Sequence, residues 1–278
     1  MDNLVARYQR LAVAGAVVIL LAGCSGEKPD AVPTPSGPAT TQSTPAPTPT
    51  PTTTTAPPTP TMSAKPPTTP APSTPVRRVF RYQPAWPFTS EARAAEWQRS
   101  YRSGGHQPWH LDAGETALSF TQSFLGFKEL KLVTSSSVRG DEAYVGVGYS
   151  IESGRKFTAA VVHLVKLGQG SDAPWEVVGT RDTDLSLTTP KYGASAGSPL
   201  TVGGRITGVD EAIRVEVRQA SSATALGTLC CIAAGGEGSP WTGRVTFRAP
   251  TDPTVVVIAS AGGHNLRTER FAITALRH

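Results

Sequence analysis

The sequence lacks the motifs that identify the commonest enzyme active sites. It contains no nucleophile elbow, phosphate-binding glycine loop, dinucleotide fingerprint or zinc-protease helix in its body. Charged residues are sparse, at 17%, and the cations behind the net charge of +5 are scattered singly. Because nucleic-acid-binding proteins gather cations into patches interleaved with aromatic rings, we expect no nucleic-acid partner. These absences favour a protein that is not an enzyme and that uses no cofactor.

The sequence also has little that could span a membrane. The apolar stretch from Leu11 to Leu21 rises only about 16 Å as a helix, whereas the hydrocarbon core of a bilayer is about 30 Å thick. Two arginines precede this stretch, and the small residues Ala22 and Gly23 follow it. That layout is typical of a secretory signal peptide, so residues 1–23 are predicted to be removed on export.

Cysteine is scarce, and one of the three cysteines directly follows this stretch. The tetrapeptide Leu21-Ala22-Gly23-Cys24 resembles the lipobox of bacterial lipoproteins. The resemblance implies that the Cys24 thiol receives a diacylglyceryl group and that the mature chain carries fatty acyl chains such as palmitate. Two or more chains, at about 0.8 kcal/mol per buried methylene, hold a protein durably at a membrane. We therefore expect a lipid anchor on the extracytoplasmic face of the cell membrane; the alternative is a signal peptide cut elsewhere, with Cys24 incidental.

Proline is abundant but unevenly placed. Most of the 25 prolines lie between Pro29 and Pro75, with threonine, serine and alanine between them. Proline locks φ and removes an amide donor, so this stretch favours extended polyproline II over helix or sheet. At about 3.1 Å per residue it could reach on the order of 150 Å. Residues 24–75 are predicted to be a disordered Pro/Thr-rich tether, either bare or O-glycosylated.

Residues 76–188 show helical and then alternating apolar patterns. Ser90 can cap a short helix that stops before Ser103, and Asp112 with Glu115 forms a capping box ahead of apolar residues at helical spacing. The period then becomes two, and turn signals separate about four strand candidates. Two helices followed by an antiparallel meander resemble the cystatin-like and nuclear-transport-factor-like α+β folds, in which a curved sheet wraps a helix. We therefore predict an α+β module.

Residues 190–278 contain short strand candidates separated by turns, at the spacing of an immunoglobulin-like β-sandwich. These candidates are Leu200–Val202, Ile213–Val217, Leu226–Ile232, Trp241–Phe247, Val255–Ser260 and Phe271–Leu276. The stretch from Ser198 to Gly204, with Val209 to Ala212, resembles the immunoglobulin-like domain associated with bacterial spore-germination proteins. That resemblance implies an extracytoplasmic interaction module without catalytic residues.

Cys230 and Cys231 are the only cysteines of the predicted body, and they are adjacent. Three states are open to them in an oxidising compartment: two thiols on opposite strand faces, a vicinal disulfide, or an intermolecular bridge. Strand alternation sends neighbouring side chains apart, and ordinary disulfides join Cα atoms farther apart than adjacent residues. The first state is therefore favoured.

Histidine provides two weak candidate sites. His106 and His110 could supply metal ligands, but no second cluster completes the set, so no metal site is predicted. His163 lies between Val161 and Val165 on one strand face. With a tyrosine or glutamate facing the same cavity it could perform acid–base chemistry, although a hydrogen-bonded structural histidine is favoured. The candidate neighbours are Tyr144, Tyr149 and Glu152.

Together these features favour a lipid-anchored, extracytoplasmic binding or scaffolding protein of the bacterial cell envelope. Its expected partners are the membrane, through the anchor, and a cell-envelope polymer or another exported protein. Two alternatives are a small-ligand carrier or enzyme that uses a cavity between helix and sheet in residues 76–188, and an accessory subunit of a cell-wall or secretion complex.

Overall fold

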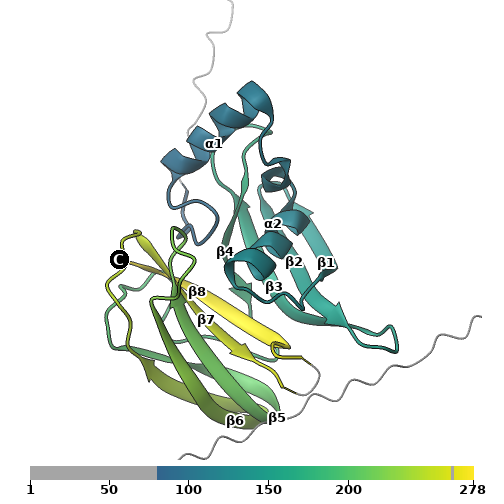
Figure 1. The fold of residues 1–278 in the computed structure, drawn as a ribbon, viewed down its shortest axis with the longest axis vertical. Coiled ribbons are helices and arrows are strands. Elements are labelled where there is room, and N and C mark those ends of the chain that lie inside the picture. The colour runs from purple at the N-terminus through teal and green to yellow at the C-terminus, as the bar shows by residue number, and fades with distance from the viewer. Residues whose placement is uncertain (1–79, 264–265) are drawn as a thin grey trace, which may run out of the picture. The chain divides into compact units, whose positions relative to one another are not determined.

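In the computed structural model, the described residues are 80–263 and 266–278, without the side chains of residues 209–211 (Figure 1). They belong to one compact unit, Pro70–His278. The predicted signal peptide, Cys24 and the whole of the predicted tether lie outside the described residues. Among the helices that are described, none combines the length and the apolar character needed to cross a membrane.

Two α-helices precede the first sheet, and side chains cap both. α1 (Glu91–Gly104) begins after Ser90, and α2 (Ala113–Ser119) begins after Asp112; each capping side chain accepts a hydrogen bond from the backbone N–H three residues on. Both caps were predicted. α1 runs slightly farther than expected, to Gly104, and the C-cap residue Gly105 has a φ of 68° that glycine readily adopts. The shorter helical turns are η1 (Pro108–Leu111) and η2 (Phe120–Phe124).

The first sheet is a four-stranded antiparallel meander in the order β1-β2-β3-β4. Its strands are β1 (Leu132–Arg139), β2 (Glu142–Ser150), β3 (Lys156–Lys166) and β4 (Trp175–Arg181). One face packs against α2 and η2, where Phe120, Leu130 and Val145 are fully buried. Apolar side chains therefore occupy the space between this sheet and the helices α2 and η2.

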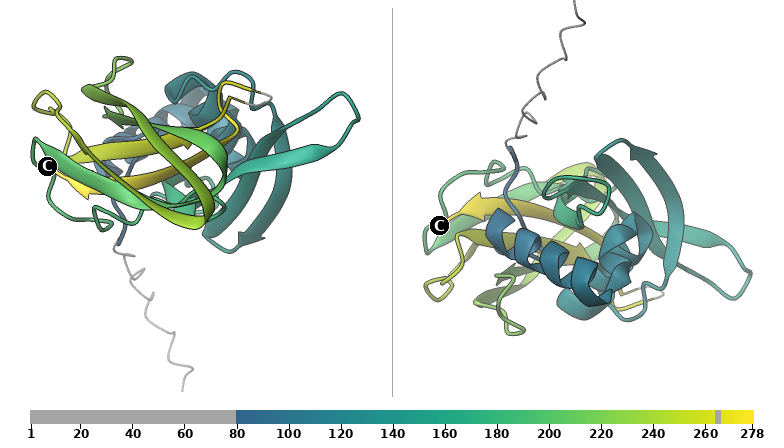
Figure 2. Two further views of the ribbon diagram at one scale, coloured as in Figure 1. Left: turned by 90° about the horizontal axis from the view of Figure 1, so that it is seen from below. Right: turned by 90° about the horizontal axis from the view of Figure 1, so that it is seen from above.

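The second sheet is also four-stranded and antiparallel, in the order β6-β5-β7-β8. Its strands are β5 (Leu200–Arg218), β6 (Gly227–Val245), β7 (Thr254–Ala261) and β8 (Arg270–Arg277). The six predicted strands form four, because β5 and β6 are long and continuous through positions where turns were expected (Figure 2). Register shifts absorb the irregular positions as β-bulges. The prediction of a mainly antiparallel β protein with two helices is confirmed.

β7 links the cores of the two sheets, because it is buried along its whole length. Val255 and Val257 belong to the cluster of the second sheet, whereas Val256 and Ile258 belong to the cluster that contains the core of the first sheet. A polar contact accompanies this packing: Ile273 N of β8 donates to Thr180 Oγ1 at 2.9 Å. The two sheets therefore share a buried boundary.

Candidate functional site

His163 lies in a polar network on the first sheet, on the face opposite the core residues of β3. Its Nε2 is 2.7 Å from Glu142 Oε1, which also accepts a hydrogen bond from Tyr144 OH at 2.8 Å. The rings of Tyr144 and His163 stack, with centroids 4.5 Å apart. Strand pairing produces this arrangement, because Tyr144 of β2 lies directly opposite His163 of β3. The expected neighbourhood of His163 and Tyr144 is thus present.

Tyr149, which we also expected near His163, lies in the core on the other face of the sheet. Tyr144 and Tyr149 are five positions apart on β2, and an odd separation on a pleated strand places two side chains on opposite faces. Tyr149 stacks on Phe157 instead. Glu152 lies in the exposed turn after β2.

Two further side chains complete the network. The Arg181 guanidinium lies 3.5 Å from the centre of the Tyr144 ring, in a cation–π contact. The ring of Tyr82 meets His163 edge-on at 5.3 Å. Tyr82 and Arg181 come from segments about a hundred positions apart, and no local pattern connects them.

The electrostatics of the network define its protonation at neutral pH. The hydrogen bond from Tyr144 lowers the pKa of Glu142, so this carboxylate is ionised. Burial lowers the pKa of His163, and the Glu142 carboxylate offsets only part of that shift. Burial, and then the Glu142 charge, raises the pKa of Tyr82. A neutral His163 with its proton on Nε2 can therefore donate to Glu142.

A cavity of about 330 Å³ opens beside this network. Tyr82 and His163 line one part of it, and Tyr192 lines another. Tyr192 as a residue is 44% exposed, and its hydroxyl accepts a hydrogen bond from Gln83 N at 2.7 Å. Burial of that hydroxyl raises the pKa of Tyr192 to about 12. The remaining walls come from β4, β8 and the segment between the sheets.

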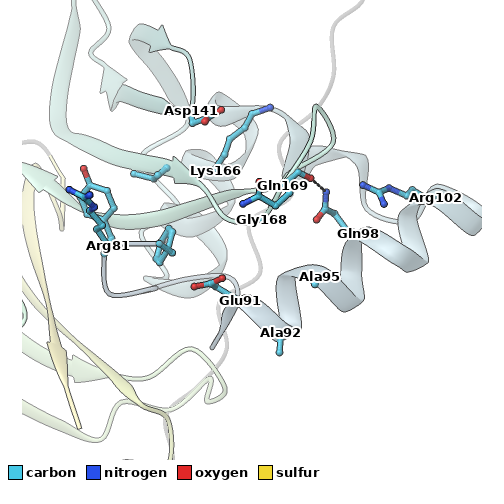
Figure 3. A pocket seen from close by; sticks show the side chains of 13 residues that line it. Arg81, Glu91, Ala92, Ala95, Gln98, Arg102, Asp141, Lys166, Gly168 and Gln169 are labelled. Carbon is cyan, nitrogen blue, oxygen red and sulfur yellow. Dashed lines mark hydrogen bonds between the residues drawn. The ribbon is translucent and has the colours of Figure 1, made fainter. Parts of the chain in front are cut away.

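A larger cavity of about 600 Å³ lies between α1 and the end of β3 (Figure 3). The surface of this cavity is mainly apolar, although charged residues are as numerous in its lining as apolar ones. The apolar members are Phe80, Tyr82, Ala92, Ala95 and Val165, and the charged members are Arg81, Glu91, Arg102, Asp141 and Lys166. Tyr82 belongs to the lining of both cavities.

Polar contacts fix the end of the larger cavity that is farthest from Arg81. Gln98 Nε2 of α1 donates to Gln169 O at 2.8 Å, which joins the helix to the loop after β3 (Figure 3). Arg102 Nη2 donates to Asp172 Oδ1 at 2.8 Å, and this pairing lowers the pKa of Asp172 to about 2. The loop and α1 are thereby held together where the cavity ends.

Tyr82 owes its place to a segment whose strand-like character the sequence analysis missed. Val177 N of β4 donates to Trp86 O at 2.7 Å, and Ala85 N donates to Val177 O at 3.0 Å. The segment before α1 therefore adds to the edge of β4. A signal was present, because aromatic residues recur at even spacing there, at Phe80, Tyr82, Trp86 and Phe88.

The structure joins Cys230 and Cys231 in a vicinal disulfide, instead of placing two thiols on opposite faces. Strand alternation does not separate the two side chains here, because β6 has a bulge. Ile232 pairs with Ile213 and Leu229 pairs with Val215, so two residues of β6 oppose one residue of β5. Side-chain alternation is interrupted at such a position.

The two candidate histidines near η1 lie in different environments. His106 is exposed, whereas His110 is buried among aromatic rings and is 4.9 Å from the Trp97 ring. Burial lowers the pKa of His110 to about 4, so it is neutral at pH 7. In the described part of the chain, no group of three or more His, Cys, Asp or Glu side chains could hold a metal ion.

Comparisons with known proteins assign no family to this chain. No family model matches it, and no match was found among curated proteins or solved structures.

Proposed function

We propose that this chain is a lipid-anchored, extracytoplasmic binding protein of the bacterial cell envelope that holds a small amphipathic ligand in the larger cavity. The observation that carries the proposal is that cavity of about 600 Å³. Small-molecule sites are typically concave, of about 300–1,000 Å³, mostly apolar and supplied with a few polar groups. The role is one of binding without catalysis.

The lining favours an amphipathic ligand over a highly charged one. Ala92, Ala95 and Val165 offer apolar surface, while cations and carboxylates occur together around them. Of the cations, Arg102 is already paired with Asp172, and Lys166 Nζ donates to Ser171 O at 3.1 Å. Because both signs of charge are present and partly neutralised, an apolar body with a small polar group suits the cavity best.

The polar network around His163 supports binding more than catalysis. Glu142 Oε1 is shared between His163 and Tyr144, and both rings are stacked or covered by neighbouring side chains. Such a network holds aromatic rings in place. Its contact with Tyr82 fixes a wall that both cavities use.

The location of the protein at the membrane is proposed from the sequence of its amino terminus. Leu21-Ala22-Gly23-Cys24 supports lipidation of Cys24, and the proline-rich residues 24–75 support a tether that holds the body away from the membrane. The partners in this proposal are the membrane, through the anchor, and a component of the cell envelope.

The finer fold assignments belong to the same proposal. The order of α1, α2 and the meander β1 to β4 supports a cystatin-like or nuclear-transport-factor-like α+β module in residues 76–188. The antiparallel strands β5 to β8 support an immunoglobulin-like sandwich in residues 190–278. An interaction module of that kind needs no catalytic residues.

Cavity filling tests the binding part of the proposal. In full-length protein, Ala95→Trp places an indole in the larger cavity, whereas Arg99→Trp places one on an exposed position of the same helix outside the lining. We expect wild type and Arg99→Trp to bind the amphipathic dye N-phenyl-1-naphthylamine, and Ala95→Trp to bind it at least about tenfold more weakly. Fluorescence titration measures this, with circular dichroism as a check of folding. Equal binding by all three proteins, or no binding by wild type, contradicts the proposal.

Detergent phase partition tests the anchoring part separately. We expect wild type to enter the detergent phase and Cys24→Ala to enter the aqueous phase, because acyl chains supply the membrane affinity. Globomycin treatment should leave wild type at its precursor size. If partition and size are unchanged in both experiments, Cys24 is not the anchor, whatever the dye titration shows.

A further inference from the structure

The disulfide between Cys230 and Cys231 lies at an exposed position on β6. Both residues are exposed. β6 occupies the edge of the second sheet, next to β5 and with no other described strand beyond it (Figure 1). A reactant can therefore approach this disulfide from solvent without crossing a packed layer.

This disulfide contributes little to holding the fold together. A disulfide stabilises a protein mainly by closing a loop in the unfolded chain, and the effect grows with loop length. A bond between adjacent residues closes no such loop. Burial of Ile213 and Val215, together with the pairing of β5 and β6, holds this region instead.

The bulge presents the disulfide at a defined place. Ile232 and Leu229, on either side of the cysteines, are partly buried and pack against the core of the second sheet. The two cysteines between them oppose only one residue of β5. The flanking residues therefore fix the backbone on both sides, while the cysteines are exposed.

We propose that Cys230–Cys231 is a thiol–disulfide exchange site whose reaction partner is a dithiol. A partner thiolate attacks one Sγ, the disulfide bond breaks, and the other Sγ leaves with the electron pair and takes up a proton. The second partner thiol then displaces the attacked Sγ from the mixed disulfide. The pair is reduced by two electrons to two thiols, and the partner dithiol is oxidised to a disulfide.

Two observations favour this role over a structural one. Exposed disulfides are the labile, regulatory or catalytic ones, whereas structural disulfides resist reduction. The edge position also leaves the backbone of β6 available to a partner that docks along a strand. The proposal is independent of the cavities and of the lipid anchor.

Reduction in the native state tests the proposal. Full-length Cys24→Ser protein carries Cys230 and Cys231 as its only cysteines, and intact mass after N-ethylmaleimide treatment counts free thiols. We expect no adduct before reduction, and two adducts after dithiothreitol at a rate within about tenfold of that in guanidinium-unfolded protein. Free thiols in the purified protein, or a disulfide that reacts only after unfolding, overturns the proposal.

A second measurement distinguishes an exchange site from a structural crosslink. We expect the Cys230→Ser/Cys231→Ser double variant to fold and to lose less than about 4 °C in thermal midpoint relative to the oxidised protein. A much larger loss would identify the disulfide as a structural crosslink and overturn the proposal. Circular dichroism follows both proteins under the same conditions.

Discussion

Glu176 is a fully buried carboxyl group in β4. Its Oε2 accepts a hydrogen bond from Phe88 N at 3.1 Å, while its Oε1 has no hydrogen-bond partner among the described residues. Burial raises the pKa of Glu176 well above its ordinary value, although the hydrogen bond acts in the opposite direction. The protonated form is therefore favoured in the folded state.

Replacing Glu176 with glutamine should make stability less sensitive to alkaline pH. The contribution of protonated Glu176 is complete below the ordinary glutamate pKa of about 4.5, and it is lost as pH rises through the raised pKa. Glutamine cannot ionise, so we expect Glu176→Gln to match wild type near pH 5 and to exceed it near pH 8. Thermal midpoints across this range measure the effect, with the exposed Glu152→Gln as the control. Parallel pH profiles for wild type and Glu176→Gln would refute this prediction.

His110 produces the opposite pH dependence. Its pKa is lowered to about 4, so its contribution is complete above the ordinary histidine pKa of 6.5 and is lost as pH falls toward 4. The loss is on the order of 3 kcal/mol at most. Between pH 7 and pH 4.5, we expect the free energy of unfolding to fall less for His110→Phe than for wild type. The exposed His106→Phe should show the same fall as wild type, and urea unfolding measures all three. An unchanged acid sensitivity of His110→Phe would count against the burial argument.

Helix starts and strand ends differed in how well the sequence predicted them. The caps at Ser90 and Asp112 were predictable because each side chain bonds a backbone N–H only three residues away. The interruptions expected within β5 and β6 did not occur, because glycine permits a bulge as readily as a turn and only tertiary pairing decides between them. The vicinal disulfide was one of three states left open for Cys230 and Cys231, because strand alternation alone does not reveal the bulge of β6 at these residues.

A glycine in β2 shows how closely the strands of the first sheet approach one another. A Cβ atom at Gly148 would overlap the backbone carbonyl of Phe157, whereas one at Gly179 of β4 would meet no atom within 4 Å. We expect Gly148→Ala to lower the free energy of unfolding by about 2–3 kcal/mol, because backbone cannot yield as a flexible side chain does. Gly179→Ala should change it by less than about 1 kcal/mol. Urea unfolding measures both variants. Equal losses of unfolding free energy would contradict the role of the close contact between Gly148 and the Phe157 backbone.

At the scale of the whole molecule, the sequence predicted which segments form strands better than it predicted how the two sheets pack together. Strand alternation places Tyr144 and Tyr149 on opposite faces of β2, but the pairing of Tyr144 with His163 depends on the register between β2 and β3. The position of Tyr82 could not be inferred from the sequence, because it depends on the segment before α1 adding to β4. The long apolar run of β7 signals burial on both faces, which a simple alternating strand does not have.

This shared boundary predicts cooperative unfolding of both sheets. Phe271 of β8 is fully buried and packs against Phe127, with ring centroids 5.5 Å apart. We expect Phe271→Ala to lower the free energy of unfolding by about 3–5 kcal/mol and to destabilise both sheets together. Tryptophan fluorescence, to which Trp241 contributes from the second sheet, should coincide with circular dichroism in one urea transition. Two separated transitions would show that the sheets unfold independently.

β7 has a strand on each side, β5 and β8, and packed side chains on both faces. Its amide protons consequently have no route to water through local fraying, since neither edge nor face is open. In deuterated buffer, the amide protons of β7 should exchange more slowly than those of any other described strand. Their exchange rate should be set by global unfolding of the protein. β7 would then record the global stability of the protein directly, amide by amide.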